Sequence, residues 1–272
     1  MKGDASSGSA TVRRGACAGR FYPGDPAELR AQVASHLAKA RVVSGRLPKA
    51  IIAPHAGYMY SGPVAGSAYA RLAAGDGLIR RVILVGPSHY ERFPGLAASS
   101  ADYFATPLGL VELDKAATAR ALSLPEVTVF DAAHRPEHCL EVQLPFLQTV
   151  LGKFTVVPLL VASGSDQEVC DVLASLWGGP ETCVIISSDL SHYLPYAVAQ
   201  EMDEVTTQMI EALDADGLQE DQACGCTPIR GLLRAARLNR LRCQTLDVRN
   251  SGDSAGSRDR VVGYGAYAFV PE

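Results

Sequence analysis

The sequence lacks several features that would assign a protein to a broad class at once. It has no long run of charges of one sign, and its 25 basic and 29 acidic side chains leave a formal charge of −4. Neither nucleic acid nor an anionic membrane surface is therefore expected as a partner. No stretch approaches the roughly 20 apolar residues that a membrane-spanning helix needs, so no membrane insertion is expected.

An export signal is also missing. Residues 1–10 are rich in Gly and Ser and contain no apolar core, which excludes a signal peptide there. We expect residues 1–12 to form a disordered tail and residues 13–272 to form a single domain, because no linker-like stretch or repeat interrupts them. The seven cysteines are accordingly interpreted as reduced thiols in the cytoplasm.

Two familiar enzyme motifs do not occur in the sequence. The absence of GxGxxG after a strand and of GxxxxGK[ST] removes the phosphate cradles of dinucleotide-binding and P-loop proteins. A GxSxG match does occur at 252–256 (GDSAG), but it lies in the loop between the last two predicted strands, whereas the nucleophile elbow of α/β-hydrolases joins a strand to a helix.

What the sequence does contain is an alternation of apolar strands and amphipathic helices. Strands are predicted at 49–53, 81–86, 95–98, 108–113, 154–161, 183–188, 243–248 and 261–270, and helices at 25–40, 61–72, 114–122, 139–151, 165–177, 196–213 and 227–241. This order predicts an α/β fold with three layers, in which a mostly parallel mixed sheet carries helices on both faces. The last two strands are close enough in the chain to pair antiparallel.

Reactive side chains follow three of the predicted strands. His55 comes just after strand 49–53, His89 after strand 81–86, and Asp189 and His192 after strand 183–188. Ligands of open α/β sheets gather at the carboxyl ends of the strands. A single histidine at the carboxyl end of a strand is usually structural. Three of the six histidines occupy this position on different strands, which favours a common site.

The residue types indicate metal chemistry. Neutral imidazole is the commonest nitrogen ligand for first-row metals, and two imidazoles need one further anionic donor to make an open site. Asp189 and Cys224 are the candidates, and Asp189 can instead orient a ligand or a catalytic imidazole. Cys224 directly precedes a helix expected to be capped by Thr227, whose positive end would lower the thiol pKa. Cys226 is interpreted as a buried packing residue.

A polar cluster at 134–143 and several tyrosines are the remaining candidates. On a helix beginning near His138, Glu141 would lie one turn later on the same side. It could support the site or contact a substrate, and a solvated helix start is nearly as plausible. Tyr60 is one of several tyrosines that could stack on an aromatic ligand or simply pack.

These residues carry a resemblance to a known family. The sequence is similar, from about residue 13 to its end, to the Memo family, whose bacterial and archaeal members are called AmmeMemoRadiSam system protein B. Six motifs occur in the family's order, namely 19–23 (GRFYP), 53–62 (APHAGYMYSG), 86–89 (GPSH), 137–146 (EHCLEVQLPF), 187–192 (SSDLSH), and Cys224-Gly225 with Pro228.

The resemblance implies a fold shared with class III extradiol ring-cleaving dioxygenases, which use Fe(II). The two histidines and one cysteine of the Memo site match His55, His89 and Cys224. His192 matches the acid/base histidine of the dioxygenases, with Asp189 as its motif neighbour, and Tyr60 matches a position that lines the pocket. Family members are also associated with AMMECR-type and radical SAM proteins.

One departure from the dioxygenases affects the chemistry. They have a glutamate where this sequence has Cys224, and a thiolate favours Cu or Zn as well as iron. We therefore expect Fe(II), with Cu or Zn as alternatives, and an oxidoreductase acting on a small aromatic molecule. The alternatives are a non-catalytic protein that handles metal or binds a peptide segment in the same pocket, and thiolate chemistry at Cys224 with His192 as base.

Overall fold

The computed structural model describes residues 10–41 and 45–272. Its strands are β1 Val12–Arg13, β2 Ala50–Ala53, β3 Arg81–Pro87, β4 Leu96–Ala98, β5 Tyr103–Thr106, β6 Gly109–Leu113, β7 Val127–Val129, β8 Thr155–Val161, β9 Thr182–Ser187, β10 His192–Leu194, β11 Leu241–Asn250 and β12 Val261–Pro271. Its α-helices are α1 Pro26–Ala38, α2 Tyr58–Ala70, α3 Lys115–Ala121, α4 Asp131–His134, α5 Leu144–Val150, α6 Asp166–Leu176, α7 Tyr196–Glu211 and α8 Cys226–Leu238.

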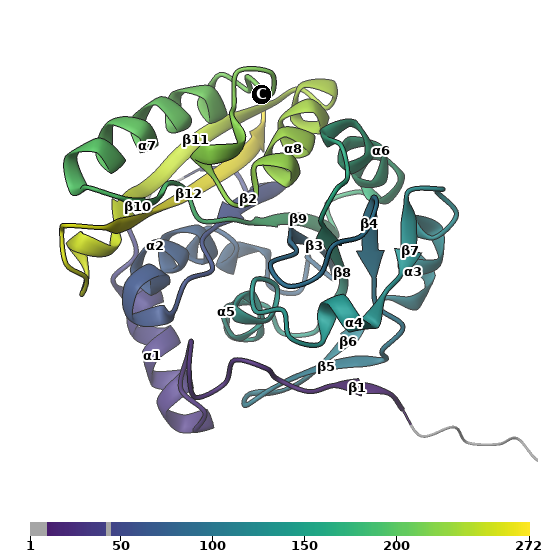
Figure 1. Cartoon of the computed structure of the whole chain (residues 1–272). Coiled ribbons are helices and arrows are strands. Elements are labelled where there is room, and N and C mark those ends of the chain that lie inside the picture. Colours follow the sequence, from purple (N-terminus) through teal and green to yellow (C-terminus); the bar gives the residue numbers. More distant parts are fainter. Residues whose placement is uncertain (1–9, 42–44) are drawn as a thin grey trace, which may run out of the picture.

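A mixed sheet forms the middle layer of the molecule (Figure 1). Its central strands run in the order β6-β8-β3-β9-β2 and are parallel to their neighbours. The predicted mostly parallel sheet is therefore confirmed. At one side β12 pairs antiparallel with β2 and also with β11, which confirms the expected pairing of the last two strands.

Helices cover both faces of this sheet, as predicted (Figure 1). Strand β3 shows why both faces must be covered, because Val82 and Leu84 join one apolar core and Ile83 and Val85 join the other. The first core includes side chains of α1, α2 and α5, and the second includes side chains of α3, α6, α7 and α8. A strand that is apolar on both sides cannot face water on either.

Local sequence signals explain where several helices begin. Asp25 caps α1 by accepting hydrogen bonds from the backbone N–H groups of Ala27 and Glu28. Ser165 and Glu168 form the expected capping box of α6. Close packing also depends on sequence, because a Cβ atom at Gly62 or Gly66 of α2 would come within 2.4 or 2.6 Å of His36 on α1.

Several predicted boundaries are wrong, and four of them matter most for the site and its helices. The helix expected over 139–151 begins only at Leu144, which places Pro145 in its first turn, where proline costs no hydrogen bond. His192 lies in the short strand β10 rather than a loop, because it pairs with β12. Helix α8 begins before Thr227, with Gly225 at its cap position. Helix α2 begins at Tyr58 rather than at residue 61.

The expected tail lies partly outside the described residues, which begin at residue 10. Within residues 10–12 the expectation of disorder is wrong. The backbone N–H and the hydroxyl of Thr11 both donate to Asp102, and Val12 begins β1 beside β5. Among the described residues, no helix combines the length and the apolar character needed to cross a membrane.

Candidate metal centre

The site lies where three neighbouring parallel strands end. Strand β9 lies between β2 and β3, so its carboxyl end adjoins both of theirs. The chain leaves β2 toward His55, β3 toward His89, and β9 toward Asp189 and His192. Cys224 joins them from the start of α8. They line one pocket of about 960 Å³, in the size range of small-molecule sites.

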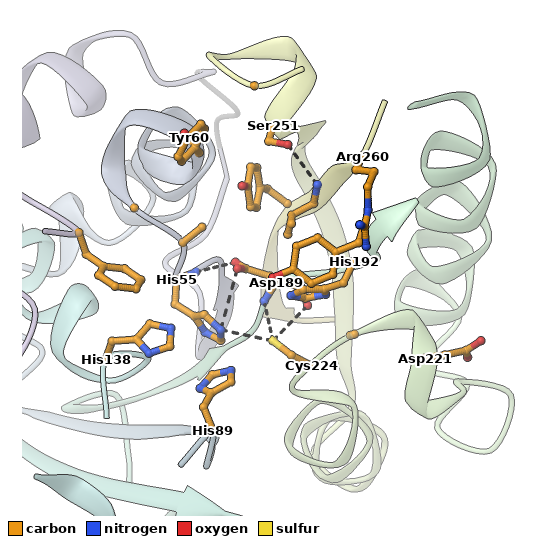
Figure 2. A pocket seen from close by; sticks show the side chains of 18 of the residues that line it. His55, Tyr60, His89, His138, Asp189, His192, Asp221, Cys224, Ser251 and Arg260 are labelled. Carbon is orange, nitrogen blue, oxygen red and sulfur yellow. Dashed lines mark hydrogen bonds and ion pairs between the residues drawn. The ribbon is translucent and has the colours of Figure 1, made fainter. Parts of the chain in front are cut away.

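Three imidazoles form the centre of this pocket (Figure 2). The ring centroids of His55 and His89 are 5.2 Å apart, those of His55 and His138 5.4 Å, and those of His89 and His138 4.7 Å. One potential ligand atom of each lies within 4.8 Å of those of the other two. The three histidines can therefore reach a single metal ion.

The Ser187 hydroxyl holds the Nδ1 atom of His55 in place. Its Nδ1 lies 2.9 Å from the hydroxyl oxygen of Ser187, whose own proton is donated to the Cys139 carbonyl at 2.6 Å. Ser187 also accepts a hydrogen bond from Gln143 at 2.8 Å. Because Ser187 has only one proton to donate, His55 must donate from Nδ1, and its Nε2 keeps a lone pair for a metal.

A buried carboxylate plays the same part for His89 and also lies close to the third imidazole, that of His138. Glu137 Oε1 lies 2.9 Å from Nδ1 of His89 and 3.2 Å from Nδ1 of His138. Glu137 also accepts hydrogen bonds from the backbone N–H groups of His89, His138 and Cys139. Such a carboxylate orients metal-binding imidazoles and leaves their Nε2 atoms available.

The charges of the site follow from this geometry. Burial alone raises the pKa of Glu137, but the hydrogen bonds from His138 and His89 outweigh it and hold this pKa far below its usual range. Burial, together with the neighbouring His89 and His138, lowers the pKa of His55 well below its usual value. The site therefore combines an ionised Glu137 carboxylate with a neutral His55 imidazole.

Asp189 and His192 lie on the side of His55 that is away from His138 (Figure 2). Asp189 Oδ1 accepts a 2.7 Å hydrogen bond from the His55 backbone N–H, and its Oδ2 lies 4.0 Å from His55 Nε2. Burial raises the pKa of this carboxyl group. His192 Nδ1 lies 2.7 Å from the Leu190 carbonyl, which can only accept, so His192 Nε2 is the nitrogen free to take a proton.

Cys224 contacts the imidazole cluster from one side only. Its Sγ lies 3.3 Å from His55 Nε2 and accepts a hydrogen bond from the Asp189 backbone N–H at 3.3 Å. The expected lowering of its pKa is wrong. Burial and the Asp189 carboxylate raise the pKa of the thiol to about 12, because they outweigh the helix end and the backbone N–H donors. Cys226 is buried, as predicted, and all seven cysteines are free thiols.

Most of the residues singled out from the sequence line this pocket, namely His55, Tyr60, His89, His138, Asp189, His192 and Cys224. Glu141 does not line the pocket. The prediction that Glu141 contacts a substrate there is therefore wrong. It lies in a 3₁₀ turn rather than on a helix beginning at His138, and its buried carboxylate pairs with Arg13 and accepts the Tyr22 hydroxyl proton. Its partners belong to the N-terminal segment.

Two contributors were missed. Glu137 stands next to His138 in the polar cluster, but nothing in the sequence shows that it reaches His89, 48 residues earlier. The hydrogen bond from His55 to Ser187 is equally invisible, since it joins the ends of two strands 132 residues apart. The signals available for Glu137 were its place at the start of the motif 137–146 and its adjacency to His138.

Comparison with known proteins now decides the family. Residues 13–268 match the model of the family described as Memo-like protein. The chain belongs to the Memo family. It is 34% identical to a MEMO1 family protein of Methanothermobacter thermautotrophicus, over 93% of this chain and 98% of that one. It is 33% identical to a MEMO1 family protein of Aquifex aeolicus, over 95% and 99% of the two chains.

A solved structure supports the fold of this Memo-family chain. An uncharacterized protein of Escherichia coli K12 superposes with a TM-score of 0.54 at 13% identity and covers 82% of this chain and 100% of its own. At that identity the likeness concerns the fold alone. The description of that protein does not mention ring cleavage, so the relation to extradiol dioxygenases stays a prediction.

Proposed function

We propose that this Memo-family protein is a metal-dependent oxidoreductase that holds Fe(II) on His55 and His89, with Cys224 and His138 completing the ligand set. The observation that carries the proposal is the cluster of three imidazoles whose ligand atoms lie within 4.8 Å of one another. The hydrogen bonds of Ser187 and Glu137 support it, because they leave the Nε2 lone pairs free.

The donors present fit such a metal. Imidazole nitrogens suit Fe(II), Cu and Zn, and a thiolate shifts the preference toward the softer ions. His55 belongs to both possible groupings, since it contacts Cys224 Sγ at 3.3 Å and lies within the three-histidine cluster. A metal binds Cys224 only as the thiolate, so binding would displace its proton and become tighter as the pH rises.

When bound, the metal would supply a Lewis-acidic, redox-active centre for O₂ and an aromatic substrate. The protein's own contribution is positioning and proton transfer. His192 can accept a substrate proton at Nε2, because the Leu190 carbonyl holds its Nδ1–H. Asp189 supports His55 by accepting a hydrogen bond from its backbone N–H.

The test is metal analysis of protein purified without air, followed by oxygen uptake with catechol. We expect stoichiometric iron, and His55→Ala and His89→Ala should each weaken iron binding by about tenfold or more. His36→Gln is the matched control, since His36 lies on α1 outside the pocket lining. Iron affinity equal to that of the unmodified protein in both alanine variants would contradict the proposal.

The same experiment separates the alternative function. Iron or copper bound at full stoichiometry, with no oxygen uptake for any catechol tested, would favour metal handling without catalysis. Cys224→Ser, compared with Cys243→Ser, then shows whether the thiol is a ligand. Cys243 is a half-buried thiol on β11 and lies outside the pocket.

A further inference from the structure

Two arginines line the mouth of the metal-site pocket without a carboxylate partner. Arg20 comes from the N-terminal segment and Arg260 from the loop before β12, and both are exposed. Within residues 10–41 and 45–272, neither takes part in an ion pair. Their side chains also make no hydrogen bond to that part of the chain. Their guanidinium donors are thus available to a ligand.

Arg260 is placed by an unusual piece of backbone. Tyr193 has φ of 58°, a left-handed conformation that is costly for a residue with a Cβ atom. It lies where the pairing of β10 with β12 shifts register between His192 and Leu194. Tyr193 as a residue is 63% exposed, and the Arg260 guanidinium carbon lies 5.4 Å from the centroid of its ring.

This arrangement makes one wall of the pocket aromatic and cationic. The ring centroids of Tyr193 and His192 are 5.7 Å apart, so Tyr193 contacts both Arg260 and the proposed proton carrier. Figure 2 shows Arg260 on the same side of the pocket as His192. A guanidinium over a ring uses its flat face there and keeps its in-plane N–H groups for a carboxylate.

The acidic residues near the pocket do not neutralise this wall. Glu220 and Asp221 lie together on a 3₁₀ turn on the Cys224 side, and in Figure 2 the Asp221 carboxylate points away from Arg260. Asp259, next to Arg260 in sequence, accepts a hydrogen bond from the Ser257 hydroxyl at 2.8 Å. Negative and positive groups therefore occupy different sides of the mouth.

We propose that the pocket takes an aromatic carboxylate whose anionic group is bound by Arg260. Aromatic side chains are present to receive the ring, since Phe21 lies 4.5 Å from His138 between ring centroids and Tyr60 and Tyr264 also line the pocket. The proposal deepens the proposed function, because it names the substrate class of the same pocket.

The test compares three probes that share a phenylpropyl skeleton, with binding followed by NMR titration. They are 3-phenylpropionate, 3-phenylpropanol and 3-phenylpropylamine, which are anionic, neutral and cationic at pH 7. We expect the carboxylate to bind on the order of tenfold more tightly than the alcohol, as for a hydrogen-bonded ion pair. Arg260→Gln should abolish that preference, and Arg260→Lys should keep part of it.

Arg258→Gln is the matched control. Arg258 lies two residues earlier, with its guanidinium carbon 4.4 Å from the Tyr196 ring centroid, and does not line the pocket. It should leave the carboxylate preference unchanged. Equal binding of carboxylate and alcohol, or tightest binding of the amine, would overturn the proposal. So would an undiminished preference in both Arg260 variants, since the carboxylate would then be held elsewhere.

Metal-loaded and chelator-treated protein are titrated in parallel, so that the two proposals fail separately. A carboxylate preference that depends on Arg260 in the metal-free protein supports this inference even if no metal is retained. Bound metal without a carboxylate preference would leave the proposed metal centre standing and reject the substrate class. A preference present only with metal would assign the carboxylate to the metal and reject Arg260.

Discussion

At the scale of single residues, Glu137 organises the candidate metal centre. One carboxylate meets Nδ1 of both His89 and His138 and also accepts three backbone N–H groups. This arrangement fixes the His89 imidazole by a hydrogen bond and places a negative charge beside the imidazole of His138. The same carboxylate lowers the cost of placing a cation nearby, because it is ionised and buried.

Glu137→Gln should therefore weaken metal binding by about 10- to 100-fold, as expected for the loss of a carboxylate behind metal-binding imidazoles. Glutamine keeps the size of the side chain but loses the charge and one acceptor atom. The measurement is metal affinity by competition with a chromophoric chelator. Glu126→Gln, a change at a half-buried position outside the pocket, is the control. Unchanged affinity in Glu137→Gln would remove this role.

At the scale of elements, α7 holds the loop that carries Asp189 and His192. Asp203 on α7 accepts a 3.0 Å hydrogen bond from the Ser191 backbone N–H within that loop. Burial raises the pKa of Asp203 to about 6. Its contribution to stability is thus fully present below the unfolded pKa near 4 and is lost as the pH rises through 6.

Asp203→Asn should make the protein more stable at pH 7 by up to roughly 3 kcal/mol, from about two units of pKa difference. The amide mimics the protonated acid and can accept the same backbone hydrogen bond. Near pH 4 the two proteins should have equal stability. Urea unfolding at pH 4, 5, 6 and 7 measures the difference between them. Parallel curves across this range would show that Asp203 does not titrate as described.

At the scale of the whole molecule, the N-terminal segment is tied to the domain by a buried ion pair. Arg13 pairs with Glu141, which lies 128 residues later, and Glu141 also accepts hydrogen bonds from the backbone N–H groups of Ala16 and Cys17. The segment continues to Phe21, whose carbonyl accepts the Tyr58 N–H beside the pocket. The ion pair therefore stabilises both the fold and one wall of the pocket.

Glu141→Gln should lower the free energy of unfolding by about 3 kcal/mol, because it leaves the Arg13 charge buried without its partner. Glu112→Gln on an exposed position of β6 should change it by less than about 0.5 kcal/mol. Both are measured by urea unfolding at pH 7. A Glu141→Gln protein as stable as Glu112→Gln would show that the pair adds no net stability.

The sequence by itself determined the layers of this protein and the placement of its reactive side chains at the carboxyl ends of strands. Apolar strands that alternate with amphipathic helices require a sheet covered on both faces, and residues that follow parallel strands must meet at one edge. His55, His89, Asp189 and His192 could be placed in this way, because the information is local to each strand end.

Only the tertiary structure decided the environment of those side chains. The carboxylate beneath His89 and His138, the partner of Glu141 and the pKa of Cys224 all depend on groups distant in sequence. Near the start of α8 the helix end and the burial of the thiol act in opposite directions, and burial prevails. Periodicity reports which side of an element is buried, whereas these contacts depend on how the elements meet.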